Sequence, residues 1–217
     1  MDFITLHEKV MEYGTFSHYI SKKYEYHSHT LKGNETIVIP KNKIIVVKSG
    51  MVAHNIKNKY GESQFELCTA GDIIFQSKNT VLDIENIKNG ELRIFDRNIV
   101  LDGLEKEGLL PHLFFDKALK AEEELLLLQN NSSNVRKKIL KLLIEVAELN
   151  KKEFGLDALI VPKEMTKVKI AKYCNCNRIS VTRLIRALEM RQMVMISAEG
   201  IYLNDKEKLL KFSYKFG

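Results

Sequence analysis

Cysteines are scarce in this sequence, and long apolar runs are missing. Three cysteines among 217 residues are an odd number for a disulfide scaffold, so we expect reduced thiols in a cytoplasmic protein. No apolar run approaches the roughly 20 residues that a membrane-spanning helix needs. The first nine residues have no basic block followed by an apolar one, so we expect no secretory signal. We therefore expect neither a membrane protein nor a membrane partner.

The usual signatures of enzymes are also missing. The sequence has no Ser/His/Asp arrangement of a hydrolase, no P-loop and no nucleotide-binding glycine triplet. Cys174 and Cys176 have no second cysteine pair that could complete a zinc site. The consecutive carboxylates Glu122, Glu123 and Glu124 fall in a helical pattern and are expected to face solvent. We therefore predict that the chain is not an enzyme and has no catalytic residues, resident metal or cofactor.

The sequence does have the composition of a packed protein, and its charge is uneven. With 45% hydrophobic and 29% charged residues, it is typical of a globular protein with one large or two modest domains. Residues 1–110 carry 14 basic and 15 acidic residues, and residues 111–217 carry 20 and 13. Eight of these bases and only two acids lie in residues 163–191. Such a confined basic block indicates either a polyanionic partner or a solvated helical face, and the pattern within the block decides between them.

The first half of the chain is predicted to form a β-roll. Eight of the eleven glycines lie in residues 1–108, where β-branched segments alternate with turn signals such as Ser49–Gly50 and Asn89–Gly90. The segments are residues 36–39, 43–48, 51–53, 64–67, 72–75, 81–84 and 91–95. No long helical period interrupts them. We therefore predict an antiparallel roll or barrel over residues 1–110 rather than a parallel α/β sheet.

Helical periodicity begins at Pro111. An apolar seam with spacings of 4-3-4-3 predicts a long helix over residues 111–131 that pairs with the same helix of a second copy. The seam consists of Phe114, Ala118, Ala121, Leu125 and Leu128. The alternative is a seam that packs on its own β-domain. The polar residues 130–134 predict a hinge, and a second helix is expected from Val135 to near Gly155.

The basic block has the pattern of a helix-turn-helix. A short helix capped by Thr166 leads into a turn and then into a second helix over residues 178–190, which is capped by Asn177. Asn175 occupies the turn position that requires a left-handed backbone, which asparagine tolerates best after glycine. The small side chain of Ala171 allows the second helix to cross closely over the first.

A β-hairpin is predicted directly after the second helix. Residues 192–196 and 201–203 have the pattern of two short strands, joined by a turn at residues 197–200. A hairpin in this place forms a wing, so we predict a winged helix-turn-helix domain over residues 132–217. The second helix of such a domain enters the major groove of double-stranded DNA.

The order of these elements resembles that of the Crp/Fnr family, the cyclic-AMP-receptor-like transcription regulators of bacteria. Residues 32–35, 46–52 and 70–74 look like turns of the family's roll, and residues 169–185 look more closely like its recognition unit. The resemblance implies an α+β fold with a cyclic-nucleotide-binding-like β-roll, a long dimerisation helix and a C-terminal winged helix-turn-helix. It further implies a homodimer that regulates transcription at a palindromic site and contacts RNA polymerase.

The residues expected to touch DNA fall into two groups. Residues that match Arg178, Ile179 and Arg183 commonly read bases in the family, and arginine is the most frequent reader of guanine. The predicted base-reading residues are Arg178, Ile179, Ser180 and Arg183. The predicted contacts to the DNA backbone are Thr166, Lys167, Lys169, Lys172, Asn177, Thr182 and Arg186. Because Ile179 replaces a glutamate that is frequent in the family, we expect a target sequence different from the commonest family site.

The sensor half departs further from the family. Members that bind cyclic nucleotides carry a Gly-Glu-Leu run and an Arg-Ser pair, which surround the phosphate with backbone donors and a cation. The corresponding residues 75–83 contain neither, and Lys78 is their only cation. We therefore predict regulation without a cyclic nucleotide, and the sequence does not name another small-molecule effector.

A second class of function stays open at this stage. His27 and His29 lie on one face of an expected strand, Glu35 follows, and His54 is a further imidazole. This set faintly resembles a cupin metal site. The alternative is therefore a cupin-like metal-binding protein or enzyme with an accessory helical domain, although surface histidines are the simpler interpretation.

Overall fold

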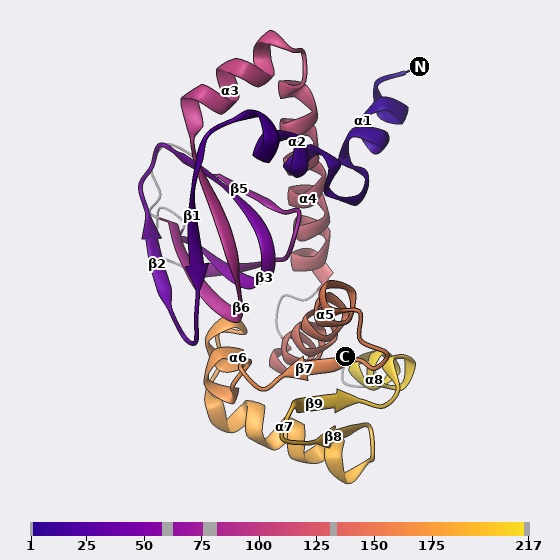
Figure 1. The fold of residues 1–217 in the computed structure, drawn as a ribbon. Helices are drawn as coiled ribbons and strands as arrows, with labels where there is room; N and C mark the ends of the chain where they lie inside the picture. The colour runs from indigo at the N-terminus through magenta and orange to yellow at the C-terminus, as the bar shows by residue number, and fades with distance from the viewer. Residues whose placement is uncertain (1, 58–62, 76–81, 131–133, 215–217) are drawn as a thin grey trace. The chain divides into compact units, whose positions relative to one another are not determined.

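The computed structural model describes residues 2–57, 63–75, 82–130 and 134–214. The chain divides into two units, Met1–Leu128 and Gln129–Gly217, whose elements are labelled in Figure 1. In the described residues, no helix combines the length and the apolar character that crossing a lipid bilayer requires.

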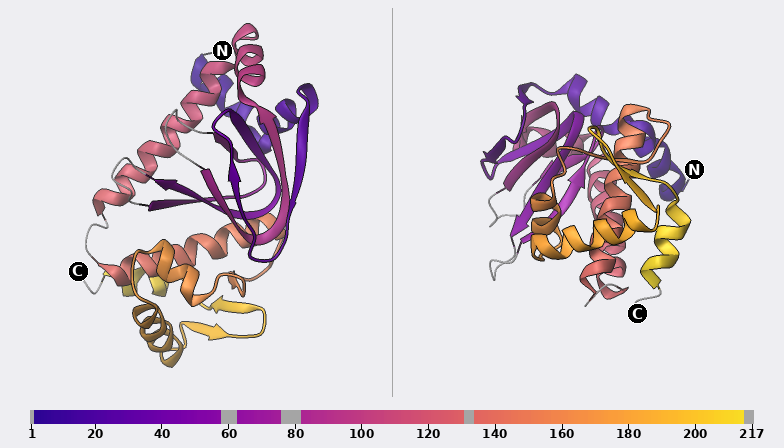
Figure 2. Two further views of the ribbon diagram at one scale, coloured as in Figure 1. Left: turned by 90° about the vertical axis from the view of Figure 1, so that its left-hand side faces the viewer. Right: turned by 90° about the horizontal axis from the view of Figure 1, so that it is seen from below.

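The N-terminal unit is an antiparallel β-roll with flanking helices (Figures 1 and 2). Its strands are β1 (Tyr26–Leu31), β2 (Thr36–Ile39), β3 (Lys43–Lys57), β4 (Ser63–Cys68), β5 (Ile73–Phe75) and β6 (Leu82–Asp96). Its helices are α1 (Phe3–Met11), the 3-10 turn η1 (Glu12–Gly14), α2 (Thr15–Lys23), α3 (Arg97–Lys106) and α4 (Leu110–Asn130). Helices α1, α2 and α3 have only nine or ten residues each. They are absent from the sequence prediction, because so short a segment shows no clear helical period.

The two longest strands, β3 and β6, form the centre of the sheet. They pair with each other in antiparallel register, so that Ile45 lies opposite Ile94 and His54 opposite Ile84. The other edge of β6 pairs with β1 and β2, and the other edge of β3 pairs with β4 and β5. All of these pairings are antiparallel, which confirms the predicted roll.

Two predicted turns are wrong, because they are bends within these long strands. Ser49–Gly50 lies inside β3 and Asn89–Gly90 lies inside β6, and shifts of register in β3 mark bulges at this point. A Cβ atom on Gly50 would lie 2.7 Å from the Cα of Gly90, and a Cβ on Gly90 would lie 2.0 Å from the carbonyl oxygen of Ser49. The glycines therefore serve the close approach of two bent strands rather than two hairpins.

Two apolar clusters cover the opposite faces of the sheet. Because successive strand residues point to opposite sides, Ile45 and Val47 join one cluster while Ile44 and Val46 join the other. The buried residues of the first cluster are Leu31, Ile39, Ile45, Val47, Val52, Cys68, Ile74, Ile84 and Leu92. Those of the second are Phe16, Ile20, Ile44, Val46, Ile73, Phe95, Val100, Leu104 and Leu113. The second cluster includes residues of α2, α3 and α4, so it fixes these helices to the sheet.

Helix α4 is the predicted long helix. It starts one residue earlier than expected, and all but its end belongs to the same unit as the roll, whereas the prediction gave residues 111–131 a part of their own. Within the predicted dimer seam, Phe114, Ala118 and Ala121 are exposed. The side chains of Leu125 and Leu128 lie outside the described part of the chain. The role of the seam in dimerisation therefore stays a prediction.

In its described residues, the C-terminal unit combines four helices with a three-stranded sheet. The helices are α5 (Val135–Phe154), α6 (Lys167–Tyr173), α7 (Arg178–Met190) and α8 (Lys206–Tyr214), and the strands are β7 (Ile160–Pro162), β8 (Val194–Ile196) and β9 (Gly200–Leu203). The strand order is β7-β9-β8, with antiparallel pairing throughout. The hairpin of β8 and β9 confirms the predicted wing, and β7 adds a strand that the sequence pattern did not indicate.

Candidate nucleic-acid interface

The two helices of the predicted helix-turn-helix begin where the sequence indicates. The hydroxyl of Thr166 accepts a hydrogen bond of 3.3 Å from the backbone N–H of Lys169. The side-chain oxygen of Asn177 accepts one of 2.8 Å from the backbone N–H of Ser180. Each residue satisfies a backbone donor that the first helical turn leaves without a partner, and so fixes the start of its helix.

The turn between the helices has the expected left-handed residue. Asn175 has a φ of 49°, and the backbone N–H of Cys176 donates to the carbonyl oxygen of Ala171 at 2.9 Å. Ala171 and Val181 are 6% and 0% exposed, so the two helices meet through these small side chains. The geometry of this turn sets the direction in which α7 leaves α6.

Helix α7 has one buried and one exposed face. Its buried residues are Val181, Leu184, Ile185 and Leu188. The predicted base-reading residues Arg178 and Arg183 are exposed, and Ile179 is 61% exposed. Arg186 is also exposed. The burial of the inner face thus turns three arginines outward on 13 residues of helix.

Two hydroxyl groups on α7 already have partners within the helix. The hydroxyl of Ser180 lies 3.0 Å from the side-chain oxygen of Asn177, and the hydroxyl of Thr182 donates to the carbonyl oxygen of Arg178 at 3.0 Å. Both residues are half-buried. These bonds fix the orientation of side chains that we predict to lie beside DNA.

The lysines of α6 differ in exposure. Lys172 is exposed and Lys167 is half-buried, whereas Lys169 is only 7% exposed. The contacts of these lysines with the DNA backbone stay a prediction.

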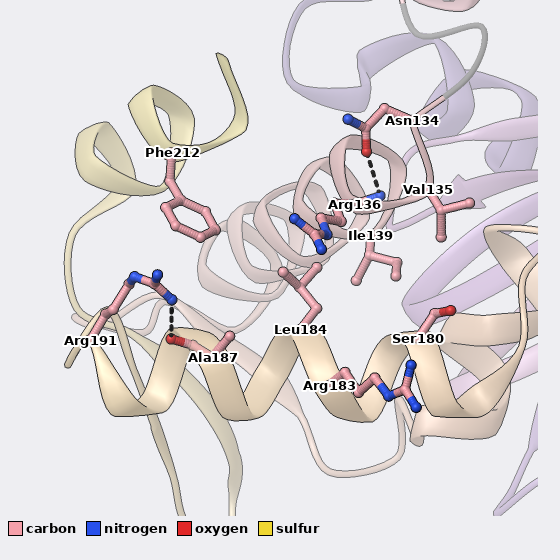
Figure 3. A pocket seen from close by; sticks show the side chains of 10 residues that line it. All are labelled: Asn134, Val135, Arg136, Ile139, Ser180, Arg183, Leu184, Ala187, Arg191 and Phe212. Atoms are coloured by element: carbon pink, nitrogen blue, oxygen red, sulfur yellow. Dashed lines mark hydrogen bonds between the residues drawn. The ribbon is translucent and has the colours of Figure 1, made fainter. Parts of the chain in front are cut away.

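A hollow of about 650 Å³ lies beside α7. It is bounded by the start of α5, by α7 and by α8, and Arg136, Arg183 and Arg191 line it together with Phe212 (Figure 3). The sequence pattern did not indicate Arg136 or Arg191 as site residues, because the first lies far from the basic block and the second follows the end of α7. A sequence signal for Arg136 did exist, because Asn134 is a good helix cap and lies two residues before it.

The two cysteines of the turn have the environment of packed thiols. Cys174 is buried, and burial raises its pKa to about 12. Burial also raises the pKa of Cys176. Because the thiolate is the reactive form of cysteine, a raised pKa lowers reactivity. Cys174 therefore belongs to the core of the domain.

Two histidines of the N-terminal unit pair with carboxylates. His29 lies 2.9 Å from Glu35 and His54 lies 3.3 Å from Glu66. In the part of the chain that the structure describes, no group of three or more His, Cys, Asp or Glu side chains is arranged to hold a metal ion. The cupin-like alternative thus gains no specific observation. The prediction that no cyclic nucleotide binds was based on residues 75–83. Of these, residues 76–81, which include Lys78, lie outside the part of the chain that the structure describes.

Comparison with solved structures confirms the fold. FixK2 from Bradyrhizobium japonicum is 17% identical, with a TM-score of 0.65 over 86% of this chain and 96% of that chain. A protein from Eubacterium rectale described as a transcriptional regulator of the Crp/Fnr family is 19% identical, with a TM-score of 0.60 over 94% of each chain. A CooA variant from Carboxydothermus hydrogenoformans is 17% identical, with a TM-score of 0.60 over 95% and 94%. No family model and no curated protein sequence matches the chain. At these identities the likeness concerns the fold, which is that of the Crp/Fnr regulators.

Proposed function

We propose that the protein is a cytoplasmic, homodimeric transcription regulator of the Crp/Fnr type that binds a specific palindromic DNA site. The observation that supports this function best is the exposed arginine face of α7 on a winged helix-turn-helix. Both helices of that motif are capped, and the inner face of α7 is buried. A partner with many negative charges fits this face, and double-stranded DNA offers a groove of the width of one helix.

Base recognition falls to the first two turns of α7. Arg178 and Arg183 can each donate two hydrogen bonds to the O6 and N7 atoms of a guanine. Ile179 has no polar atom in its side chain and fits the methyl group of a thymine instead. Ser180 lies between these residues, at the edge of the same face.

Contacts to the DNA backbone surround this centre. The side chains proposed to meet phosphates are Thr166, Lys167, Lys169, Lys172, Asn177, Thr182 and Arg186. Such contacts fix the register of the protein on the duplex without reading its sequence. They also make binding depend on salt, because each neutralised phosphate releases counterions.

A second copy would bind through helix α4. Phe114 is 48% exposed, and Ala118 and Ala121 next to it on the seam are exposed too. Small and apolar side chains at heptad spacing suit the close packing of two helices. Two copies related by a two-fold axis would place their α7 helices about one turn of DNA, roughly 34 Å, apart.

The effector is proposed not to be a cyclic nucleotide. This part of the proposal rests on residues 75–83, which lack the Gly-Glu and Arg-Ser pairs that cyclic-nucleotide binders of this fold carry. RNA polymerase is the protein partner that the family resemblance implies.

Selection of bound fragments from random DNA tests the proposal. A homodimer should select an inverted repeat whose half-sites are about one helical turn apart. In a titration at fixed salt, Arg183→Ala should lower the preference for the selected duplex over a scrambled one by about 1–3 kcal/mol. Arg186→Gln is the matched control, and it should weaken binding to both duplexes equally.

Two results would contradict the proposal. A selection that returns no enriched sequence would remove specific DNA binding. An unchanged preference in Arg183→Ala would show that α7 does not lie in the groove as we propose.

A further inference from the structure

Three arginines line the hollow beside α7, and the proposed base recognition uses only one of them, Arg183. Arg136 comes from the first turn of α5, Arg183 from the middle of α7 and Arg191 from directly after α7 (Figure 3). None of the residues that line the hollow is acidic. The hollow lies wholly within the C-terminal unit, so its shape depends on that unit alone.

The start of α5 adds to this positive potential. Asn134 caps the helix, and its side-chain oxygen accepts hydrogen bonds of 2.9 Å and 3.4 Å from the backbone N–H groups of Arg136 and Lys137. The N-terminus of a helix of 20 residues carries the positive end of the helix dipole. This end and the Arg136 side chain lie at the same side of the hollow (Figure 3).

Arg191 is held in place by two contacts. Its Nη1 donates to the carbonyl oxygen of Ala187 at 3.2 Å, and its guanidinium lies 5.1 Å from the centre of the Phe212 ring. An arginine has five N–H donors, so these contacts orient the group and leave donors for a ligand. Fixed donors cost less entropy on binding than mobile ones.

The walls of the hollow also have apolar parts. Ile139, Leu184 and Ala187 contribute aliphatic surface between the arginines. A ligand that matches this lining has an anionic group and an apolar or sugar-like body. The same hollow is bordered by Ser180 and Arg183, which belong to the helix proposed to enter the groove. The sugar–phosphate backbone of a DNA duplex bound to α7 has this chemistry and lies next to the hollow.

We infer that this hollow receives the phosphodiester backbone of the bound DNA, with Arg136 and Arg191 as phosphate-binding residues. The inference rests on the proposed function and extends it from α6 and α7 to α5 and the end of α7. It enlarges the DNA footprint of each protomer. Neither arginine contacts a base in this arrangement, so both add affinity without adding sequence preference.

The test compares the salt dependence of DNA binding among variants of the full chain. Fluorescence anisotropy measures the affinity for the selected and for the scrambled duplex at KCl concentrations from about 50 to about 300 mM. Log affinity falls as log salt concentration rises. Arg136→Gln and Arg191→Gln should each make this negative slope shallower by about 0.9 per protomer. Their ratio of specific to nonspecific affinity should equal that of the wild type.

Two control variants separate charge at the hollow from general effects. Lys152→Gln removes an exposed charge from the far end of α5, about 24 Å from Arg136 along the helix, and should leave the slope unchanged. Arg191→Lys keeps the charge but loses the planar group that packs on Phe212, and should retain most of the slope. A matched loss in Arg191→Lys and Arg191→Gln would assign Arg191 a merely structural role and overturn its part in the inference.

The outcomes distinguish this inference from the proposed function. Wild-type slopes in Arg136→Gln and Arg191→Gln, together with lost preference in Arg183→Ala, would overturn the inference and leave the proposed function intact. An unchanged preference in Arg183→Ala would overturn the proposed function itself. The other source of a phosphate is a free anion. If inorganic phosphate, at constant ionic strength, raises the melting temperature of the wild type but not of Arg136→Gln, and the salt slopes do not change, the hollow belongs to a free anion.

Discussion

The two units of the chain use their charged residues differently. Residues 1–128 contain 16 basic and 19 acidic residues, and residues 129–217 contain 18 and nine. In the N-terminal unit, charges join elements that are distant in sequence. Lys120 of α4 lies 3.0 Å from Asp72, and Lys43 of β3 lies 3.4 Å from Asp96 at the end of β6. The C-terminal unit has such a pair between Lys206 of α8 and Glu148 of α5, but its helix α7 presents three arginines and a single acid, Glu189.

This difference distinguishes charges that stabilise a fold from the exposed arginines that we propose to bind DNA. Burial lowers the pKa of Lys120, but the neighbouring carboxylates of Asp72 and Asp116 raise it above its ordinary value. The ammonium group is thus stabilised within its own unit. An arginine on the exposed face of α7 gains little from the fold, since exposed ion pairs contribute at most about 1 kcal/mol. Under the proposed function, its use lies in the complex with DNA.

We expect the greatest loss of stability from a substitution where β3 and β6 approach each other in the N-terminal unit. In Gly90→Ala the new Cβ would lie 2.0 Å from the carbonyl oxygen of Ser49, a backbone atom that cannot rotate away. We expect a loss of about 3 kcal/mol in the free energy of unfolding, at the upper end of the range for overpacked sites. Gly33→Ala is the matched control. A Cβ there meets no atom within 4 Å, and its φ of 58° should cost only about 1 kcal/mol.

Urea denaturation followed by circular dichroism measures both losses. Equal losses would mean that the roll adapts at the bend, and that close approach of β3 and β6 does not hold the unit together. A C-terminal unit with unchanged helix content in Gly90→Ala would sharpen the contrast between the two units.

The same bend shows where sequence patterns reach their limit. Dipeptides such as Asn89–Gly90 indicate a change of chain direction, but a hairpin and a bulge at a strand crossing use the same residues. The distinction depends on a backbone 40 residues away in sequence, at Ser49–Gly50. Local patterns do not contain that contact, so the number of strands was predicted wrongly while their pairing sense was right.

The candidate site could be predicted better because its signals are local. Thr166, Asn175 and Asn177 each act on backbone atoms within a few residues of themselves. The exposure of a lysine on α6 depends on what packs around a short helix, so the sequence pattern did not separate the buried Lys169 from the exposed Lys172. The place of Arg136 beside α7 depends on packing between helices that are distant in sequence, so it emerged only from the structure.

A smaller effect tests a buried pair of histidines in the N-terminal unit. His7 of α1 and His112 of α4 are 5% and 3% exposed, and their Nδ1 atoms are 3.3 Å apart. Phe3 stacks on His112 with ring centres 4.7 Å apart, and Phe115 lies edge-on against His7. The two rings share a hydrogen bond only while one Nδ1 carries no proton. Burial and the neighbouring His7 lower the pKa of His112 below its ordinary value.

The sign of the pH effect follows from that lowered pKa. As pH falls through the ordinary value of about 6.5, the unfolded chain binds a proton at His112 before the folded chain does. The stability of the N-terminal unit is therefore complete above this pH and is lost progressively below it, until the pKa of the folded state is passed. Urea denaturation between pH 7.5 and 5.5 should show this fall, and His112→Phe should reduce it. Parallel pH profiles for the two proteins would remove the histidine pair as the cause.

The smallest expected effects come from a matched pair of charge removals, one in each unit. Lys120→Gln should lower the free energy of unfolding by about 1 kcal/mol, because it removes the cation that pairs with the carboxylates of Asp72 and Asp116. Arg186→Gln should change it by less than about 0.5 kcal/mol, as is usual for an exposed surface residue. Its effect should appear in DNA affinity instead, with no counterpart in Lys120→Gln. Scanning calorimetry and a DNA titration on the same two variants measure all four values. Equal losses of stability would mean that the arginine face of α7 also holds its own domain together, and its charge would then no longer indicate a partner.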